Sequence, residues 1–243
     1  MSLLQIKGLS KSFAGLKALD GVTASVESHE VLGIIGPNGA GKTTLFSCIA
    51  GQITPTTGRV VFDGQDITGW PAWKVARAGL VRTFQLMRPF ESMTVLDNVA
   101  AATHSRHRSR RVARDNAAEV IERVGLSDYR DRMSGTLPTA GLKRLELARA
   151  LALTPQVLML DEVLAGLVPT ERKPLIDLLG TLRGEGVTLL FIEHIMPAVM
   201  TLSDRVLVLH EGKPLAEGTP HEVTSNPRVV QAYLGEESQI AES

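Results

Sequence analysis

This 243-residue chain has one cysteine, no long apolar run and no net charge. Its single cysteine, Cys48, excludes an internal disulfide and is typical of a reducing compartment. No apolar run approaches the ~20 residues that a helix needs to span a bilayer, and the first residues do not resemble a secretory signal. We therefore expect a cytoplasmic chain that does not itself cross a membrane, with Cys48 as a buried small hydrophobe rather than a reactive thiol.

The charges balance, since Lys and Arg number 26 and so do Asp and Glu, and no overall field draws the chain to nucleic acid or to an anionic membrane. One basic run, residues 104–114, is best interpreted as a solvated loop because no aromatic side chains are interleaved to stack on bases. A nucleic-acid patch and a contact with lipid headgroups are the open alternatives. The length and the 44% of hydrophobic residues indicate a soluble globular protein.

A glycine-rich loop is the most informative pattern in the chain. Residues 36–44, GPNGAGKTT, match the phosphate-binding pattern G-x-x-x-x-G-K-[ST] at every specified position. The apolar run 31–35 before them is typical of a buried parallel strand, and the residues after them of a helix. A glycine-rich turn with a stray lysine would not explain this context. We predict a nucleoside triphosphate site formed by Gly36, Pro37, Asn38, Gly39, Ala40, Gly41, Lys42, Thr43 and Thr44.

Each part of this loop has a chemical reason to be there. Glycines let backbone N–H groups close around the phosphates, and the N-terminus of the following helix adds the positive end of its dipole. Lys42 is expected to reach the β- and γ-phosphates, and the hydroxyl of Thr43 to ligate Mg²⁺.

Short strands and helices alternate along most of the chain, which predicts an α/β fold with a mostly parallel sheet and helices on both faces. Between about residues 86 and 154 the pattern is helical only, so we expect a helical insert. The polar tail 235–243 is expected to fray. The expected strands are residues 3–7, 22–26, 31–35, 59–62, 81–84, 157–160, 188–192 and 205–209, and the expected helices are 44–50, 71–78, 94–104, 112–124, 142–153, 170–184 and one that ends at 202.

Hydrolysis of a bound triphosphate needs a metal ligand and a base, and the strand at 157–160 is followed by two carboxylates. Asp161 is placed to hold Mg²⁺, directly or through water, and Glu162 to polarise the attacking water as a general base. The alternative, two acidic residues that cap the next helix, is the weaker interpretation in a chain that already has a phosphate loop.

Two further candidates directly follow expected strands. His194 can donate a hydrogen bond to a γ-phosphate oxygen, although a structural histidine is the commoner case. Gln85 can ligate Mg²⁺ or the attacking water, although a solvated loop glutamine is the commoner case. Neither role follows from the residue alone.

Together these motifs resemble the ATP-binding subunits of ABC transporters over about residues 4–234. In chain order they are similar to the aromatic that stacks on adenine (Phe13), Walker A (36–44), the Q-loop glutamine (Gln85), Walker B with its catalytic glutamate (158–162), the D-loop (165–167) and the switch histidine (His194).

The resemblance implies a P-loop NTPase fold of the RecA-like type, with an antiparallel β subdomain beside the mostly parallel sheet. It implies a nucleotide-binding domain at residues 1–235 and a tail at 236–243. It also implies ATP and Mg²⁺ as cofactors, metal contacts from Thr43, Gln85 and Asp161, and catalysis by Lys42, Gln85, Glu162 and His194.

A closer resemblance is to the ATPases of importers for branched-chain amino acids and related amides or urea. It rests on RTFQ at 82–85, MTVLDNV at 93–99, IEH at 192–194 followed by MTLSD at 200–204, and AEGTP at 216–220. It implies an ATPase peripheral to the cytoplasmic face of the inner membrane. The implied partners are two transmembrane permease subunits, a second ATPase subunit and an external solute-binding protein, with no nucleic acid.

Two other functions stay open at this stage. A soluble ABC-type ATPase that acts on ribosomes or DNA is disfavoured because the chain is a single domain without coiled-coil heptads. A P-loop kinase outside this family would leave Gln85 and His194 unexplained.

One segment departs from the family pattern. The signature Leu-Ser-Gly-Gly-Gln, which pins the γ-phosphate of ATP held by the partner subunit, aligns without a gap on LPTAG at 137–141. Pro138 stands where serine is usual and has neither a hydroxyl nor an N–H group. A one-residue shift would place Thr139 on the serine, but it would rotate the following helix by about 100°. We therefore expect a non-identical partner ATPase and two unequal sites.

Overall fold

The structure is a computed structural model that describes residues 2–83, 89–103 and 109–240, with side chains described up to Tyr233. Its strands are β1 (Ser2–Phe13), β2 (Leu16–Glu27), β3 (Val31–Ile35), β4 (Thr57–Phe62), β5 (Gln65–Asp66), β6 (Leu80–Arg82), β7 (Val157–Asp161), β8 (Thr188–Ile192), β9 (Arg205–His210) and β10 (Lys213–Gly218). Its helices are α1 (Lys42–Ile49), α2 (Ala72–Ala78), α3 (Val95–Thr103), α4 (Arg110–Arg123), α5 (Thr139–Leu151), α6 (Pro169–Gly184), α7 (Met196–Leu202), α8 (Pro220–Thr224) and α9 (Pro227–Ile240), with 3₁₀ turns at Ser127–Tyr129 and Ser134–Thr136.

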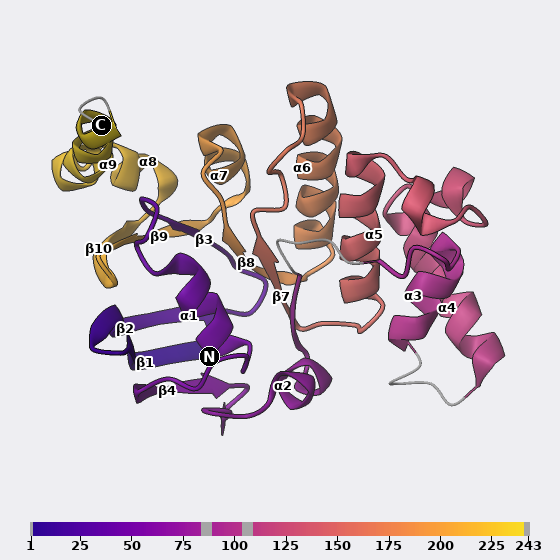
Figure 1. Cartoon of the computed structure of the whole chain (residues 1–243), viewed down its shortest axis with the longest axis horizontal. Coiled ribbons are helices and arrows are strands. Elements are labelled where there is room, and N and C mark those ends of the chain that lie inside the picture. The colour runs from indigo at the N-terminus through magenta and orange to yellow at the C-terminus, as the bar shows by residue number, and fades with distance from the viewer. Residues whose placement is uncertain (1, 84–88, 104–108, 241–243) are drawn as a thin grey trace.

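Two sheets form the core, and α1 lies between them (Figure 1). The larger sheet has the order β10-β9-β3-β8-β7-β6, in which the strands from β9 to β6 run parallel and β10 is antiparallel to β9. The smaller sheet is antiparallel, with the order β2-β1-β4-β5. The predicted α/β fold with a mostly parallel sheet and an antiparallel β subdomain is therefore confirmed.

The central strands are buried on both faces, and successive side chains point to opposite layers. On β7, Leu158 and Leu160 belong to the apolar cluster formed with α3 to α7, whereas Val157 and Met159 belong to the cluster around α1 and the smaller sheet. Figure 1 shows α5, α6 and α7 over the face of the sheet that is turned away from α1. Because both faces of these strands are covered, their sequences are continuously apolar rather than alternating.

Each expected strand and helix has a counterpart, but several boundaries differ. β1 and β2 each span 12 residues, because register shifts along their pairing interrupt the period-two pattern on which the shorter estimates relied. β10 was not expected, since this edge strand contains Pro214 and has no fully buried residue. The backbone of the tail is helical up to Ile240 as part of α9, and its fraying stays a prediction.

Where the structure describes it, the insert between β6 and β7 is helical, as predicted, with α3, α4, α5 and the two 3₁₀ turns. The basic run lies partly outside the described residues, but its last part is not a loop, because Arg110, Arg111 and Arg114 belong to α4. Arg114 forms an ion pair with Asp97 of α3. The Arg114 side chain therefore helps to join these two helices on the surface.

Two predictions from composition bear on the interior and the surface. Cys48 of α1 is 3% exposed, and burial raises the pKa of its thiol to about 11, so it is a protonated, buried residue as expected. Across the described ranges, no helix combines the length and the apolar character of a membrane span.

Candidate nucleotide-binding site

The glycine loop joins the central strand β3 to α1, and two of its glycines are required by geometry. Gly36 has φ 150°, and a Cβ atom there would lie 2.1 Å from the carbonyl oxygen of Leu209. Gly41, the N-cap of α1, has φ 96°, and a Cβ atom there would lie 2.5 Å from the carbonyl oxygen of Ala18. Only glycine fits these positions without a shift of backbone.

The loop presents positive groups toward the start of α1. The ammonium of Lys42 donates hydrogen bonds to the carbonyl oxygens of Gly36 at 2.6 Å and Pro37 at 2.8 Å. In the described part of the chain, the N–H groups of Gly39 and Gly41 have no hydrogen-bond acceptor. Thr43 is exposed in the first turn of α1. Unused amides, an ammonium and a helix N-terminus form an anion site of the kind that holds phosphates.

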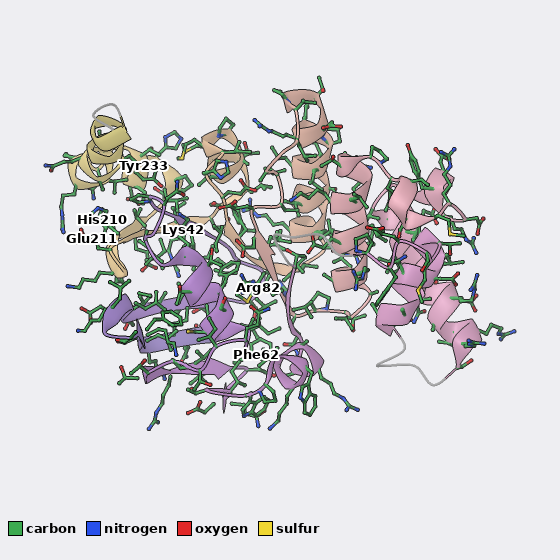
Figure 2. All side chains as sticks on the ribbon, in the orientation of Figure 1. Lys42, Phe62, Arg82, His210, Glu211 and Tyr233 are labelled. Atoms are coloured by element: carbon green, nitrogen blue, oxygen red, sulfur yellow. The ribbon has the colours of Figure 1, made fainter. Side chains whose placement is uncertain are left out.

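Asp161, at the end of β7, is paired with an arginine that the sequence analysis did not place in the site. Arg82 lies at the end of the adjacent strand β6 (Figure 2). It approaches Asp161 Oδ2 to 2.5 Å, and the two side chains are 7% and 1% exposed. Arg82 also donates to Ser47 Oγ at 2.9 Å and Gln52 Oε1 at 2.6 Å. The sequence does contain a signal for this pair. Arg82 lies in one expected strand and Asp161 follows another, so the two could have been predicted to meet if the strands were neighbours.

The residues at this point fit a magnesium ion. Asp161 Oδ1 is buried and has no hydrogen-bond partner among the described residues. Mg²⁺ prefers hard oxygen ligands, which this carboxylate oxygen and the Thr43 hydroxyl would supply. Gln85, the third predicted metal contact, lies outside the described residues.

Arg82→Gln is expected to lower the free energy of unfolding by about 3–5 kcal/mol, because it leaves the Asp161 carboxylate buried and unpaired. Urea unfolding at neutral pH measures this. Arg114→Gln is the matched control, since it removes an arginine–aspartate pair whose side chains are 51% and 40% exposed, and is expected to cost below about 1 kcal/mol. Equal losses in the two variants would contradict the expectation.

Glu162 occupies a tight turn directly after β7. Its backbone is left-handed, with φ 49°, and its N–H donates to the carbonyl oxygen of Ile192 at 3.0 Å. Its own carbonyl oxygen accepts from Ala165 N at 3.1 Å and from Lys143 Nζ at 3.3 Å. These contacts therefore fix the backbone position from which the half-buried Glu162 side chain extends.

The sheet brings the other candidates to the same edge. β3, β8 and β7 are parallel neighbours, so the loop after β3, His194 after β8, and Asp161 and Glu162 at the end of β7 share the carboxyl edge. His194 is exposed there. Phe13 lies apart, at the end of β1 in the other sheet, 44% exposed, with Lys11 Nζ 5.0 Å from its ring centroid. The shared edge agrees with the roles predicted for Asp161, Glu162 and His194, and these roles and that of Phe13 stay predictions.

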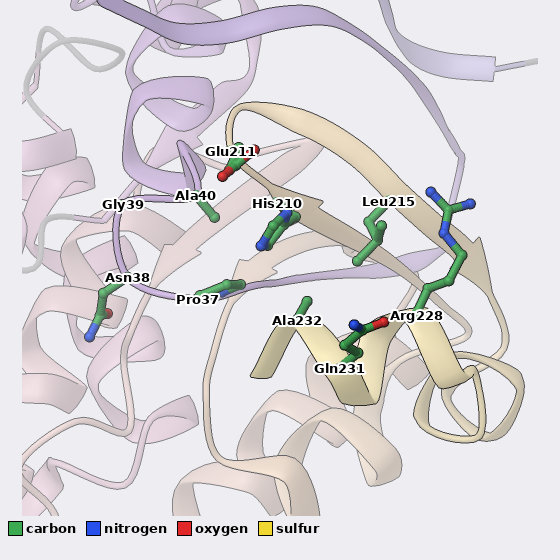
Figure 3. A pocket seen from close by; sticks show the side chains of 10 residues that line it. All are labelled: Pro37, Asn38, Gly39, Ala40, His210, Glu211, Leu215, Arg228, Gln231 and Ala232. Carbon is green, nitrogen blue, oxygen red and sulfur yellow. The ribbon is translucent and has the colours of Figure 1, made fainter. Parts of the chain in front are cut away.

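A cavity of about 600 Å³ adjoins the outer side of the loop (Figure 3). Its walls are residues 37–40, the turn between β9 and β10 with His210 and Glu211, and α9 with Arg228 and Gln231. Lys42 is not among the lining residues, so the cavity borders the phosphate loop without containing its lysine.

The segment 137–141, which departs from the family signature, begins a helix. Pro138 is the N-cap of α5 in an extended conformation, and no side-chain hydrogen bond caps the helix. A helix N-terminus is thus present where the signature would be, but Pro138 offers no hydroxyl to a phosphate.

Comparisons with known proteins agree with this geometry. The profile of a family described as "ABC transporter" matches residues 19–165, and that of "Branched-chain amino acid ATP-binding cassette transporter" matches residues 213–238. The chain is 45% identical to the high-affinity branched-chain amino acid transport ATP-binding protein BraF of Pseudomonas aeruginosa, over 96% of this chain and 98% of that protein. It is 42% identical to LivG of Escherichia coli with the same coverage.

More distant relatives extend the comparison. The lipopolysaccharide export system ATP-binding protein LptB of Haemophilus influenzae is 33% identical, over 99% of this chain and 100% of that protein. Among solved structures, a nucleotide-free ATP-binding cassette from an ABC transporter superposes with a TM-score of 0.88 at 33% identity, covering 96% of this chain and 99% of that one. A cassette in its ADP conformation gives the same TM-score at 34% identity, covering 97% and 99%.

Proposed function

Because the chain belongs to the family of ABC transporter ATP-binding subunits, we propose that it energises a membrane importer for branched-chain amino acids or related small solutes. The observation that carries this proposal is the phosphate loop on β3 and α1 in a chain whose last part matches the branched-chain amino acid family. Identity is 45% and 42% to the two amino acid transport relatives named above and 33% to the lipopolysaccharide export relative, which favours the former class of solute.

Each residue of the candidate site has its own role in ATP hydrolysis. Lys42 and the loop amides hold the β- and γ-phosphates, and Phe13 stacks on the adenine. Thr43, Gln85 and Asp161 would hold Mg²⁺, which would neutralise charge on the phosphate oxygens. Glu162 accepts a proton from the attacking water, and His194 donates a hydrogen bond to a γ-phosphate oxygen.

The unusual segment at Pro138 supports a specific set of partners. A serine hydroxyl would bind the γ-phosphate of ATP held by the facing subunit, and Pro138 at the N-cap offers neither a hydroxyl nor an N–H group in its place. A non-identical ATPase subunit would supply an intact signature to the loop of this chain. Two transmembrane permeases and an external solute-binding protein complete the assembly, with this chain peripheral on its cytoplasmic face.

Reconstitution tests the proposal. The full chain is expected to co-purify from membranes with permease subunits and a second ATPase, and ATP-driven uptake of radiolabelled leucine into proteoliposomes should depend on the solute-binding protein. Uptake of a sugar is the negative control. Isolation of the chain with ribosomes or DNA instead of permeases would support the alternative function, which has no support among the relatives named above.

A further inference from the structure

A buried carboxylate lies beside the candidate site but has no part in the proposed chemistry. Glu193 comes between β8 and His194 and is only 2% exposed. Its Oε1 atom accepts a hydrogen bond from the backbone N–H of Leu164 at 2.9 Å. Its Oε2 atom is buried and has no hydrogen-bond partner in the described part of the chain. Burial of a carboxylate is costly, so its presence here needs a reason.

The hydrogen bond from Leu164 fixes the turn that carries Glu162. Two other contacts hold the same turn, since Glu162 N donates to the carbonyl oxygen of Ile192 at 3.0 Å and Lys143 Nζ, from the 4% exposed Lys143 of α5, donates to the Glu162 carbonyl oxygen at 3.3 Å. A left-handed residue other than glycine persists only where surrounding contacts over-determine its conformation. Glu193 provides one of those contacts from the strand that leads to His194.

We propose that Glu193 is a positioning residue for ATP hydrolysis, which holds the Leu164 amide and so keeps the Glu162 carboxylate in register with His194. The proposal rests on the role of Glu162 as general base. It assigns Glu193 no contact with nucleotide or metal: its effect passes through the backbone of residues 162–164.

The electrostatics of Glu193 agree with a role as acceptor rather than as charge. Burial raises its pKa above the ordinary value, and the hydrogen bond from Leu164, with the charge and the backbone N–H of neighbouring His194, offsets that only in part. Glutamine has an uncharged amide of the same shape, whose oxygen can accept the same bond. Methionine has a similar length but no such acceptor.

Three variants of the full chain, assayed for ATPase activity in the transporter assembly, test the proposal. Glu193→Met is expected to lower kcat on the order of 10²-fold, as small misplacements of catalytic groups do, with the KM for ATP within about twofold. Glu193→Gln is expected to retain kcat within a few-fold. Thr188→Val is the matched control, because buried Thr188, at the other end of β8, also accepts from a backbone N–H, that of His29 at 2.8 Å. It should lower Tm without lowering kcat.

Amide hydrogen exchange of the segment 162–166 gives a readout independent of Glu162 chemistry. Glu193→Met is expected to lose protection at Leu164, whereas Glu193→Gln and Thr188→Val keep it. If Glu193→Met does not fold, Glu193→Ala is measured in its place. The proposal would be overturned if kcat fell in proportion to Tm in every variant or if Glu193→Gln failed to retain kcat. It would also be overturned if protection at Leu164 were unchanged in Glu193→Met. A Glu162→Gln variant with full activity would instead overturn the role of Glu162 and leave the exchange result standing.

Discussion

Lys42→Ala is expected to reduce ATP hydrolysis by about 10²–10³-fold and to weaken nucleotide binding, because it removes the only ammonium of the phosphate loop. In the structure this group is held at 2.6 and 2.8 Å from the carbonyl oxygens of Gly36 and Pro37, so it is already oriented within the loop. Alanine also removes the Lys42 donor from both carbonyl groups, of which that of Pro37 still accepts from Ala40 N at 3.2 Å. Calorimetric titration with ATP and steady-state hydrolysis measure the two effects separately.

A matched control distinguishes the loss of the phosphate-loop ammonium from the loss of a positive charge in general. Lys173→Ala removes an ammonium from the exposed surface of α6, and both ATP affinity and turnover should stay within about twofold of the unmodified protein. Unchanged affinity and turnover in Lys42→Ala would mean that nucleotide binds elsewhere. Every role assigned to the carboxyl edge of the sheet would then lose its basis.

Glu162→Gln is expected to reduce hydrolysis by about 10²–10⁴-fold while ATP binding is kept, because the amide cannot accept the proton of the attacking water. The substitution preserves length and leaves the backbone contacts of the turn, with Ile192, Ala165 and Lys143, in place. Single-turnover hydrolysis by the mixed dimer is the appropriate measurement, since it reports the site of this subunit without repeated cycling of the other.

The control for this variant is Glu119→Gln, on the exposed surface of α4, which should hydrolyse ATP at the unmodified rate. Bound ATP that turns over normally in Glu162→Gln would exclude the glutamate as the base. In the proposed heterodimer, the corresponding change in the second ATPase should have a smaller effect, because that subunit faces Pro138 instead of an intact signature.

The part of the site that could be predicted is the part fixed by local rules. The loop between β3 and α1 follows from glycines at fixed spacing, between a strand buried on both faces and a helix, and each of these features is contiguous in the chain. The carboxylates after β7 and the histidine after β8 were found in the same way. Parallel pairing then places all three at one edge, which needs no knowledge of side-chain contacts.

The contacts that could not be predicted join residues far apart in the chain. Arg82 and Asp161 are 79 positions apart, and Glu193 and Leu164 are 29 apart, so no local pattern links them. Their burial depends on which strands become neighbours and in what register. The start of α5 at Thr139 rather than Leu142 was missed for a related reason, since the apolar period begins later than the helix that Pro138 opens.

The left-handed backbone at Glu162 implies a compromise between the stability of the fold and its catalytic activity. Glycine would adopt this conformation without the roughly 1–3 kcal/mol that such a position costs other residues, yet glycine carries no carboxylate. At this position a more stable chain would therefore be a less active one. Selection for heat resistance alone would favour replacement of this glutamate and leave a subunit that binds ATP without hydrolysing it.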